Sequence, residues 1–206
     1  MVRQGQYNLY IQAAIAIGAL FVALLAIWGD SIKSWFLGPR LKVVVRLKPP
    51  YCNRSINGTW FRIEVKNKSS TVARDVELWI VELARVVGPD GVPMDLVPPP
   101  LTWTHSSKAT APSINPSFTR YCDLGYLDES NPPPVPPDFY LSTEIQPNDR
   151  STRLGPASYR MRIAVTASNA KVRYFVMRFE VPNYIPPTEG SALEAVNLRL
   201  DDNGSE

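Results

Sequence analysis

Residues 60–66 read WFRIEVK, and this heptapeptide decides the fold class of the main domain. From Phe61 onward, large apolar side chains alternate strictly with charged ones. Because successive side chains of an extended chain point to opposite faces, the segment has one apolar face and one charged face. A period of two residues predicts a half-buried β-strand.

Comparable segments lie on both sides of this strand. The extended segments predicted from the sequence are 41–48, 76–87, 92–97, 117–124, 139–141, 159–165 and 171–181. For residues 76–87 a helix remains the alternative, since apolar positions there also recur at helical spacing. Segment 49–59 is expected to be a loop, and in segment 98–116 Trp103 is expected to pack across the mouth of the core. About seven or eight strands, joined by turn residues and rich in proline, predict an all-β, immunoglobulin-like antiparallel β-sandwich.

Two short phrases in this region carry a family resemblance. Residues 61–68 (FRIEVKNK) followed by 73–77 (ARDVE) resemble the second and third strands of bacterial immunoglobulin-like domains of the CARDB type, with Ser69 in place of their usual glycine. The segments PRLKV at 39–43 and YCDLG at 121–125 are similar to those of uncharacterised bacterial single-pass membrane proteins. The resemblance implies a fold and no activity.

A long apolar stretch precedes the predicted sandwich. Leu9 to Trp28 read LYIQAAIAIGALFVALLAIW, without a charge. About twenty such residues in a helix match the thickness of the hydrocarbon core of a bilayer. The bulky residues at its end do not form a signal-peptide cleavage site, so an uncleaved transmembrane helix is expected. Trp28, Trp35 and Phe36 are suited to the membrane interface.

These features predict five segments. They are a short N-terminal flank (1–8), a transmembrane helix (9–28), an aromatic and basic juxtamembrane segment (29–40), the Ig-like sandwich (41–182) and a flexible C-terminal tail (183–206). Within the tail, residues 191–200 have the composition of a brief helix.

Flanking charge predicts the orientation of the anchor. Lys33 and Arg40 follow the apolar stretch, with further basic residues shortly after them, whereas Arg3 alone precedes it. Because Lys and Arg next to a membrane helix stay on the cytoplasmic side, the sandwich is expected in the cytoplasm, anchored in the inner membrane. The bilayer itself is then one partner of the protein.

Candidate catalytic residues are few. His105 is the single histidine and lies in a Thr-His-Ser-Ser segment without a nucleophile elbow. The carboxylates of Asp123, Asp128, Glu129 and Asp138 do not have the spacing of a calcium loop. The expectation is therefore a protein without a catalytic site, metal or cofactor, and a hydrolase built on His105 or the acidic residues is the remaining enzymatic alternative.

Binding is the predicted function. Arg62, Arg160 and Arg162 are outward-facing positions that, on one face, form a basic stripe for lipid head groups or an acidic partner; otherwise they are ordinary solubilising charges. The formal net charge of +3 is too small to predict a nucleic-acid partner, and no small-molecule substrate is indicated.

Two functions follow from these features. The first is a membrane-anchored, non-enzymatic interaction or scaffolding subunit at the cytoplasmic face. The alternative is an extracytoplasmic cell-envelope or adhesion-type binding domain, in which Cys52 and Cys122 form a disulfide.

Overall fold

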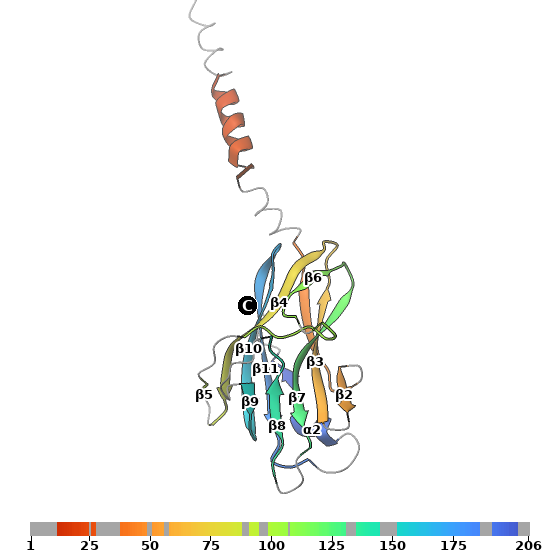
Figure 1. Ribbon diagram of the computed structural model, residues 1–206. Helices are drawn as coiled ribbons and strands as arrows, with labels where there is room; N and C mark the ends of the chain where they lie inside the picture. Colours follow the sequence, from red (N-terminus) through yellow and green to blue (C-terminus); the bar gives the residue numbers. More distant parts are fainter. Residues whose placement is uncertain are drawn as a thin grey trace, which may run out of the picture. The chain divides into compact units, whose positions relative to one another are not determined.

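The chain forms two separate compact units in the computed structural model, Met1–Gly38 and Pro39–Glu206. The residues that the structure describes are 12–24, 26–27, 38–48, 51–55, 58–87, 91–94, 99–106, 108–130, 135–144, 152–185 and 191–201. The two units are described one at a time (Figure 1).

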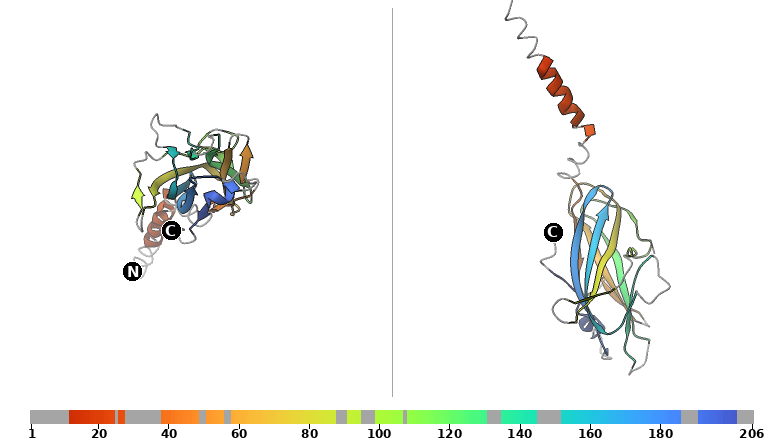
Figure 2. Two further views of the ribbon diagram at one scale, coloured as in Figure 1. Left: turned by 90° about the horizontal axis from the view of Figure 1, so that it is seen from below. Right: turned by 90° about the vertical axis from the view of Figure 1, so that its left-hand side faces the viewer.

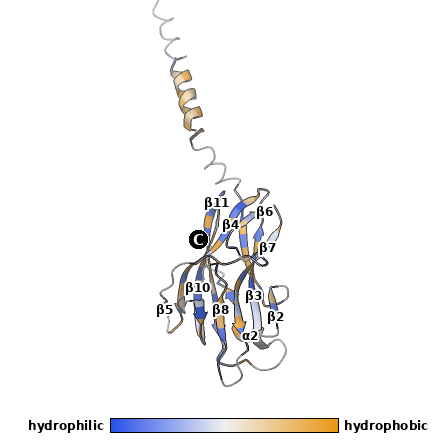
Figure 3. Cartoon of the chain, viewed as in Figure 1, coloured by the Kyte–Doolittle hydropathy of each residue, from blue (hydrophilic) through white to orange (hydrophobic). Residues whose placement is uncertain are grey.

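The first unit is described only in part. Residues 12–24 and 26–27 are helical, and colouring by hydropathy shows this helix as predominantly apolar (Figure 3). Among the described residues, no helix has the length and apolar character needed to span a membrane. The predicted anchor residues Leu9, Trp28, Lys33, Trp35 and Phe36 lie outside the described residues.

The second unit is built from two antiparallel sheets. Six strands of the described residues form sheet 1, in the order β1-β3-β7-β8-β9 with β2 also paired to β3. Their bounds are β1 Leu41–Val45, β2 Cys52–Ser55, β3 Gly58–Asn67, β7 Thr119–Asp128, β8 Asp138–Leu141 and β9 Arg153–Leu154.

Sheet 2 is the second layer. Six described strands form it, in the order β12-β11-β10-β4-β5 with β6 also paired to β4. Their bounds are β4 Ala73–Arg85, β5 Val92–Pro93, β6 Ala111–Ile114, β10 Ala157–Ala167, β11 Ala170–Val181 and β12 Arg199–Leu200, and the helix α2 spans Ser191–Val196 before β12. Two views at right angles show the strands as an elongated β domain (Figure 2).

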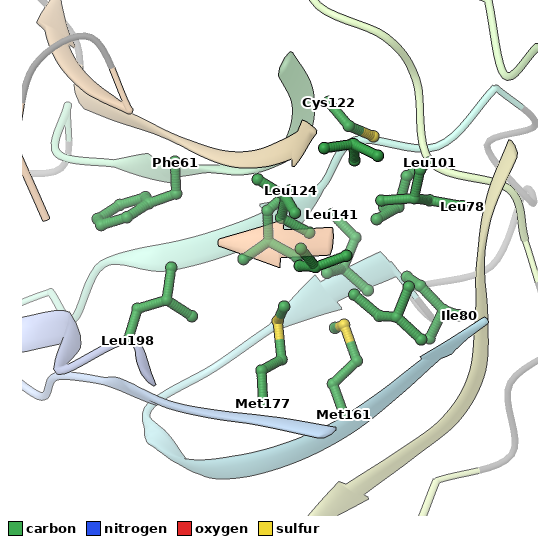
Figure 4. Packing of buried hydrophobic residues seen from close by; sticks show 14 of the residues in the cluster. Phe61, Leu78, Ile80, Leu101, Cys122, Leu124, Leu141, Met161, Met177 and Leu198 are labelled. Atoms are coloured by element: carbon green, nitrogen blue, oxygen red, sulfur yellow. The ribbon is translucent and has the colours of Figure 1, made fainter. Parts of the chain in front are cut away.

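The inner faces of the two sheets form one hydrophobic core. Phe61 and Leu124 from sheet 1 lie across the core from Met161 and Met177 from sheet 2, and all four are fully buried (Figure 4). Trp103 is buried as well, and its indole Nε1 donates hydrogen bonds to the carbonyl oxygens of Val76 and Ala109. This arrangement confirms the predicted all-β sandwich.

The WFRIEVK segment is the centre of sheet 1, because β3 pairs with β1 and β2 along one edge and with β7 along the other. At the end of β3 the buried Asn67 amide donates to the carbonyl oxygens of Thr71 (2.7 Å) and Ile114 (3.0 Å). Its amide oxygen accepts from the Ser69 hydroxyl at 2.7 Å. The turn after β3 is therefore held by side-chain hydrogen bonds that Ser69 helps to make.

Most of the predicted strands are present, and one predicted loop is not a loop throughout. Residues 76–85 belong to the strand β4, so the helical alternative is wrong there. The predicted loop 49–59 contains β2, and β6 lies in segment 98–116, where no strand was predicted. Each of these two strands has only four residues and is defined by pairing with β3 or β4, which a local sequence pattern does not encode.

The predicted boundary at residue 182 also differs from the structure. Val196 at the end of α2 is fully buried, Leu198 is 5% exposed, and both belong to the core cluster. β12 then pairs with β11. Because these apolar side chains cover the core beside β11, the domain extends at least to Asp201, and the prediction of a flexible tail from residue 183 is wrong for this part.

Candidate functional site

The predicted basic stripe is divided between two sheets. Arg62 lies on β3 in sheet 1, whereas Arg160 and Arg162 lie on β10 in sheet 2. All three occupy outward positions of their strands. Alternation defines the face of a strand and does not define the sheet to which the strand belongs, so the condition for one stripe that includes Arg62 is not met.

A different set of arginines does form a row. Arg160 of β10 lies directly opposite Arg178 of β11, and Arg178 lies opposite Arg199 of β12. All three side chains are exposed on the outer face of sheet 2. We call these three residues the arginine row. Neighbouring strands are about 4.8 Å apart, so the row brings three positive charges within about 10 Å of sheet surface.

The charge of the arginine row is only partly balanced within the domain. Arg178 Nε lies 2.9 Å from Asp201 Oδ2, in a pair whose side chains are 51% and 26% exposed. Among the described residues, neither Arg160 nor Arg199 has a carboxylate within ion-pair distance. Like charges directly opposite one another on a sheet are destabilising, so the row is unfavourable for folding.

Arg162 extends the basic surface beside an aromatic ring. Its guanidinium carbon is 4.4 Å from the centroid of the Tyr174 ring, a distance typical of a cation–π contact. Glu82 and Val176 are its cross-strand neighbours. The surface around the arginine row thus combines guanidinium groups with partly exposed apolar side chains, which is a composition enriched at protein interfaces.

Three arginines of sheet 1 form ion pairs with carboxylates of the same domain. Arg62 Nε contacts Asp123 Oδ1 at 3.1 Å, and the Thr104 hydroxyl donates to the same oxygen at 2.7 Å. Two further pairs on this sheet are Arg54 with Glu129 at 2.9 Å and Arg153 with Asp138 at 2.5 Å. These pairs involve three of the four carboxylates considered for calcium or hydrolysis, and Asp128 Oδ1 accepts the Ser130 backbone N–H.

His105 does not join those carboxylates. It is exposed, in a turn closed by a 3.1 Å hydrogen bond from Ser106 N to Trp103 O, and its φ is 67°. The described residues contain no hydrogen bond between its imidazole and an acidic side chain, and they contain no cluster of three potential metal ligands. The described residues therefore do not place His105 beside a carboxylate, as a hydrolase based on this histidine would require.

The cysteines are free thiols, both buried. Cys52 of β2 and Cys122 of β7 pair with opposite edges of β3, at Phe61 and Ile63 respectively. Two strand spacings separate them, about 10 Å, which exceeds the Cα separation of a disulfide. The suggested bridge is therefore not formed. Burial raises the pKa of Cys52 to about 11 and also raises that of Cys122.

Sequence analysis did not single out Glu64, Arg178 or Arg199. Glu64 is only 8% exposed on β3, and its Oε2 has no hydrogen-bond partner among the described residues. A hydrogen bond with Glu64 raises the pKa of Tyr51 to about 12. The alternation in the predicted strand 171–181 places Arg178 on its outward face, so this residue could have been found from the sequence. Arg199 could not, because its position depends on the pairing of the C-terminal segment with β11.

No protein-family model matches this chain, and neither does any curated protein. Function is therefore inferred from the geometry of the chain's own residues.

Proposed function

We propose that this protein is a membrane-anchored, non-enzymatic interaction subunit whose sandwich lies in the cytoplasm. Two features of the sequence support this topology, namely the uncharged stretch Leu9 to Trp28 and the basic residues that follow it, including Lys33 and Arg40. The sandwich is immunoglobulin-like in this proposal, which is consistent with its two antiparallel sheets and with the CARDB-like phrase at residues 61–77.

The observation that carries the proposal is the arginine row. Arg160 and Arg199 have no ion pair among the described side chains, although each lies directly opposite Arg178. An arrangement that opposes folding and is exposed to solvent is explained by a partner with complementary charge. We infer that the partner is a protein with an acidic surface.

The neighbours of the row favour a protein over a lipid head group. Tyr174 and Val176 lie beside Arg162 on the same face and are half-buried. Arginine and tyrosine side chains next to apolar area are typical of the energetically important centre of a protein interface. A lipid head group uses positive charge and has no need of such neighbours.

Charge reversal tests this assignment. The full chain is purified from native membranes in mild detergent as the wild type, as Arg160→Glu/Arg199→Glu and as the control Lys68→Glu/Lys108→Glu. The control makes the same change in net charge at exposed lysines outside the row. Proteins recovered with the wild type and the control, and lost from the arginine variant, support the proposal. Equal recovery with all three proteins contradicts it.

Topology is tested separately. Fusions after Glu206 carry either a reporter active only in the cytoplasm or one active only outside it. The proposal predicts a signal from the cytoplasmic reporter alone. A signal from the external reporter alone contradicts the orientation and leaves the assignment of the arginine row to be judged by charge reversal.

A further inference from the structure

A pocket of about 330 Å³ lies on sheet 1, away from the arginine row. Residues of three segments line it. They are Arg62 from β3, Thr119, Arg120 and Tyr121 from β7, and Trp103, Thr104 and His105 from the segment that precedes β6. We call it the turn pocket. Its volume is at the lower end of the range for small-molecule sites, so it fits a ligand of few atoms.

The backbone on one side of the turn pocket is firmly placed. Residues 102–104 run beside β7, where Thr104 N donates to Tyr121 O at 2.9 Å and Asp123 N donates to Thr102 O, also at 2.9 Å. The turn at Trp103–Ser106 follows directly. The pocket is therefore formed by hydrogen-bonded backbone, which is a requirement for a preorganised site.

His105 occupies an unfavourable position in this turn. It is the third residue of the hydrogen-bonded turn and has φ 67°, a conformation that favours glycine. Strained backbone of this kind is energetically costly and clusters at functional sites. His105 lines the pocket from this position.

Arg62 is positioned by its neighbours. Its Nε contacts Asp123 Oδ1 at 3.1 Å, and Thr104, which also lines the pocket, donates to the same oxygen. The side chains of Arg62 and Asp123 are 17% and 16% exposed, so water screens this pair only in part. The guanidinium group is consequently a fixed part of the pocket wall.

The lining residues define the chemistry of the ligand. They include two arginines, one histidine and the hydroxyl groups of threonine and tyrosine, and none of them is acidic. N–H groups of arginine and histidine bind carboxylates strongly, whereas Tyr121 offers an aromatic ring. We propose that the turn pocket binds a small organic acid, with its carboxylate at His105 and its flat apolar part against Tyr121.

Binding is measured by fluorine NMR with 4-fluorobenzoate and the full chain in detergent micelles. The expected Kd is about 1 mM, as for other ligands of about ten atoms. His105→Gly relieves the backbone strain and removes the imidazole, so it is expected to raise the Tm and to weaken binding about tenfold. 4-Fluorobenzylamine, a cation of similar shape, is expected not to bind.

Ser117→Gly is the matched control. Ser117 has φ 64°, is the third residue of the turn closed by Phe118 N and Asn115 O, and does not line the pocket. This variant is expected to raise the Tm with unchanged binding. Absence of binding to the wild type, equal binding to His105→Gly, or binding of 4-fluorobenzylamine as tight as that of 4-fluorobenzoate overturns the proposal.

Competition distinguishes two sources of the carboxylate. N-acetylphenylalanine represents the C terminus of a protein, and unlabelled benzoate represents a free acid. Tighter competition by N-acetylphenylalanine assigns the pocket to a chain end, and tighter competition by benzoate assigns it to a free acid. The pocket and the arginine row are on different sheets, so either proposal can fail without the other.

Discussion

Three arginines of sheet 1 and the three arginines of the row on sheet 2 differ in how their charges are balanced. On sheet 1, Arg54, Arg62 and Arg153 each contact a carboxylate of the same domain. On sheet 2, Asp201 is the one described carboxylate within ion-pair distance of the three arginines of the row. Charges that are balanced internally contribute to the fold, whereas charges left unbalanced on an exposed face are available to a partner. The difference separates structural arginines from candidate binding arginines.

One ion pair of sheet 1 is much less exposed than the pair of the row. Arg62 and Asp123 are less than one-fifth exposed, and the Thr104 hydroxyl donates to the same Asp123 oxygen. Arg178 on sheet 2 is about half exposed. Ion pairs of the first kind affect stability strongly when broken, and those of the second kind affect it little.

The largest expected effect is on sheet 1. Asp123→Ala removes the acceptor of both Arg62 and Thr104 and leaves a half-buried guanidinium group without this carboxylate, so it is expected to lower the free energy of unfolding by about 2 kcal/mol. Urea denaturation of the full chain in detergent measures it. Asp201→Ala on sheet 2 is the matched control, with an expected loss of about 0.5 kcal/mol. Equal losses would remove the distinction between the faces.

The second largest expected effect is a loss of folding stability at alkaline pH, caused by the two buried thiols of sheet 1. Both thiols belong to this sheet, and burial raises the pKa of Cys52 from 9.0 to about 11 and that of Cys122 in the same direction. The unfolded chain therefore loses these protons first as pH rises above 9. Stability is fully present well below pH 9. The Cys52 thiol lowers it by about 1 kcal/mol by pH 10, and the Cys122 thiol acts in the same direction.

Denaturation of the reduced protein at pH 7 to 10 measures this loss. Cys52→Ala/Cys122→Ala, which has no thiol to ionise, is expected to show a smaller decrease over the same range. A decrease of the same size in the double variant would show that other groups cause it.

On sheet 2, a substitution in the arginine row is expected to raise the free energy of unfolding, whereas the changes on sheet 1 lower it. Arg160→Glu changes a like-charge neighbour of Arg178 into an opposite one and is expected to raise the free energy of unfolding by about 0.5 kcal/mol. The same variant weakens partner binding under the proposed function. Lys108→Glu, an exposed change of equal charge, is the control with no expected gain. A loss of stability in Arg160→Glu would show that the row is part of the structural framework.

An effect of similar size is expected at the aromatic neighbour of the row. Arg162→Gln removes the contact with the Tyr174 ring and is expected to lower the free energy of unfolding by about 0.5 kcal/mol. Tyr174→Leu in the Arg162→Gln background supplies the double-mutant cycle that isolates the pair. A coupling energy of zero would mean that Arg162 is as available to a partner as Arg160.

The local sequence pattern predicted most of the strands but did not predict which side chains come together at the candidate sites. The alternation in WFRIEVK correctly assigned Arg62 to an outward position, because side-chain direction follows from the backbone of one strand. Its partner Asp123 comes from a strand about sixty residues later, through a pairing with a register shift between Phe61 and Arg62. Such pairing depends on tertiary contacts that the heptapeptide does not contain.

The arginine row could not be predicted because one of its members, Arg199, lies in a C-terminal segment without a clear strand or helix pattern. Arg199 lies in a two-residue strand that follows a six-residue helix, and both are held by the burial of Val196 and Leu198 against the core. Isolated apolar residues in a polar segment do not predict such docking. For the same reason Cys52, on the four-residue strand β2, had no predictable distance from Cys122.

The most direct test of the account compares contacts made by the two outer faces in native membranes. A photo-crosslinking residue replaces either Ser158, which flanks the row on β10, or Tyr140, which is 37% exposed on β8 of sheet 1. The account predicts protein adducts from position 158 that disappear when Arg160→Glu/Arg199→Glu is added, and none of these adducts from position 140. The same adducts from both positions, or adducts at position 158 that survive charge reversal, would contradict it.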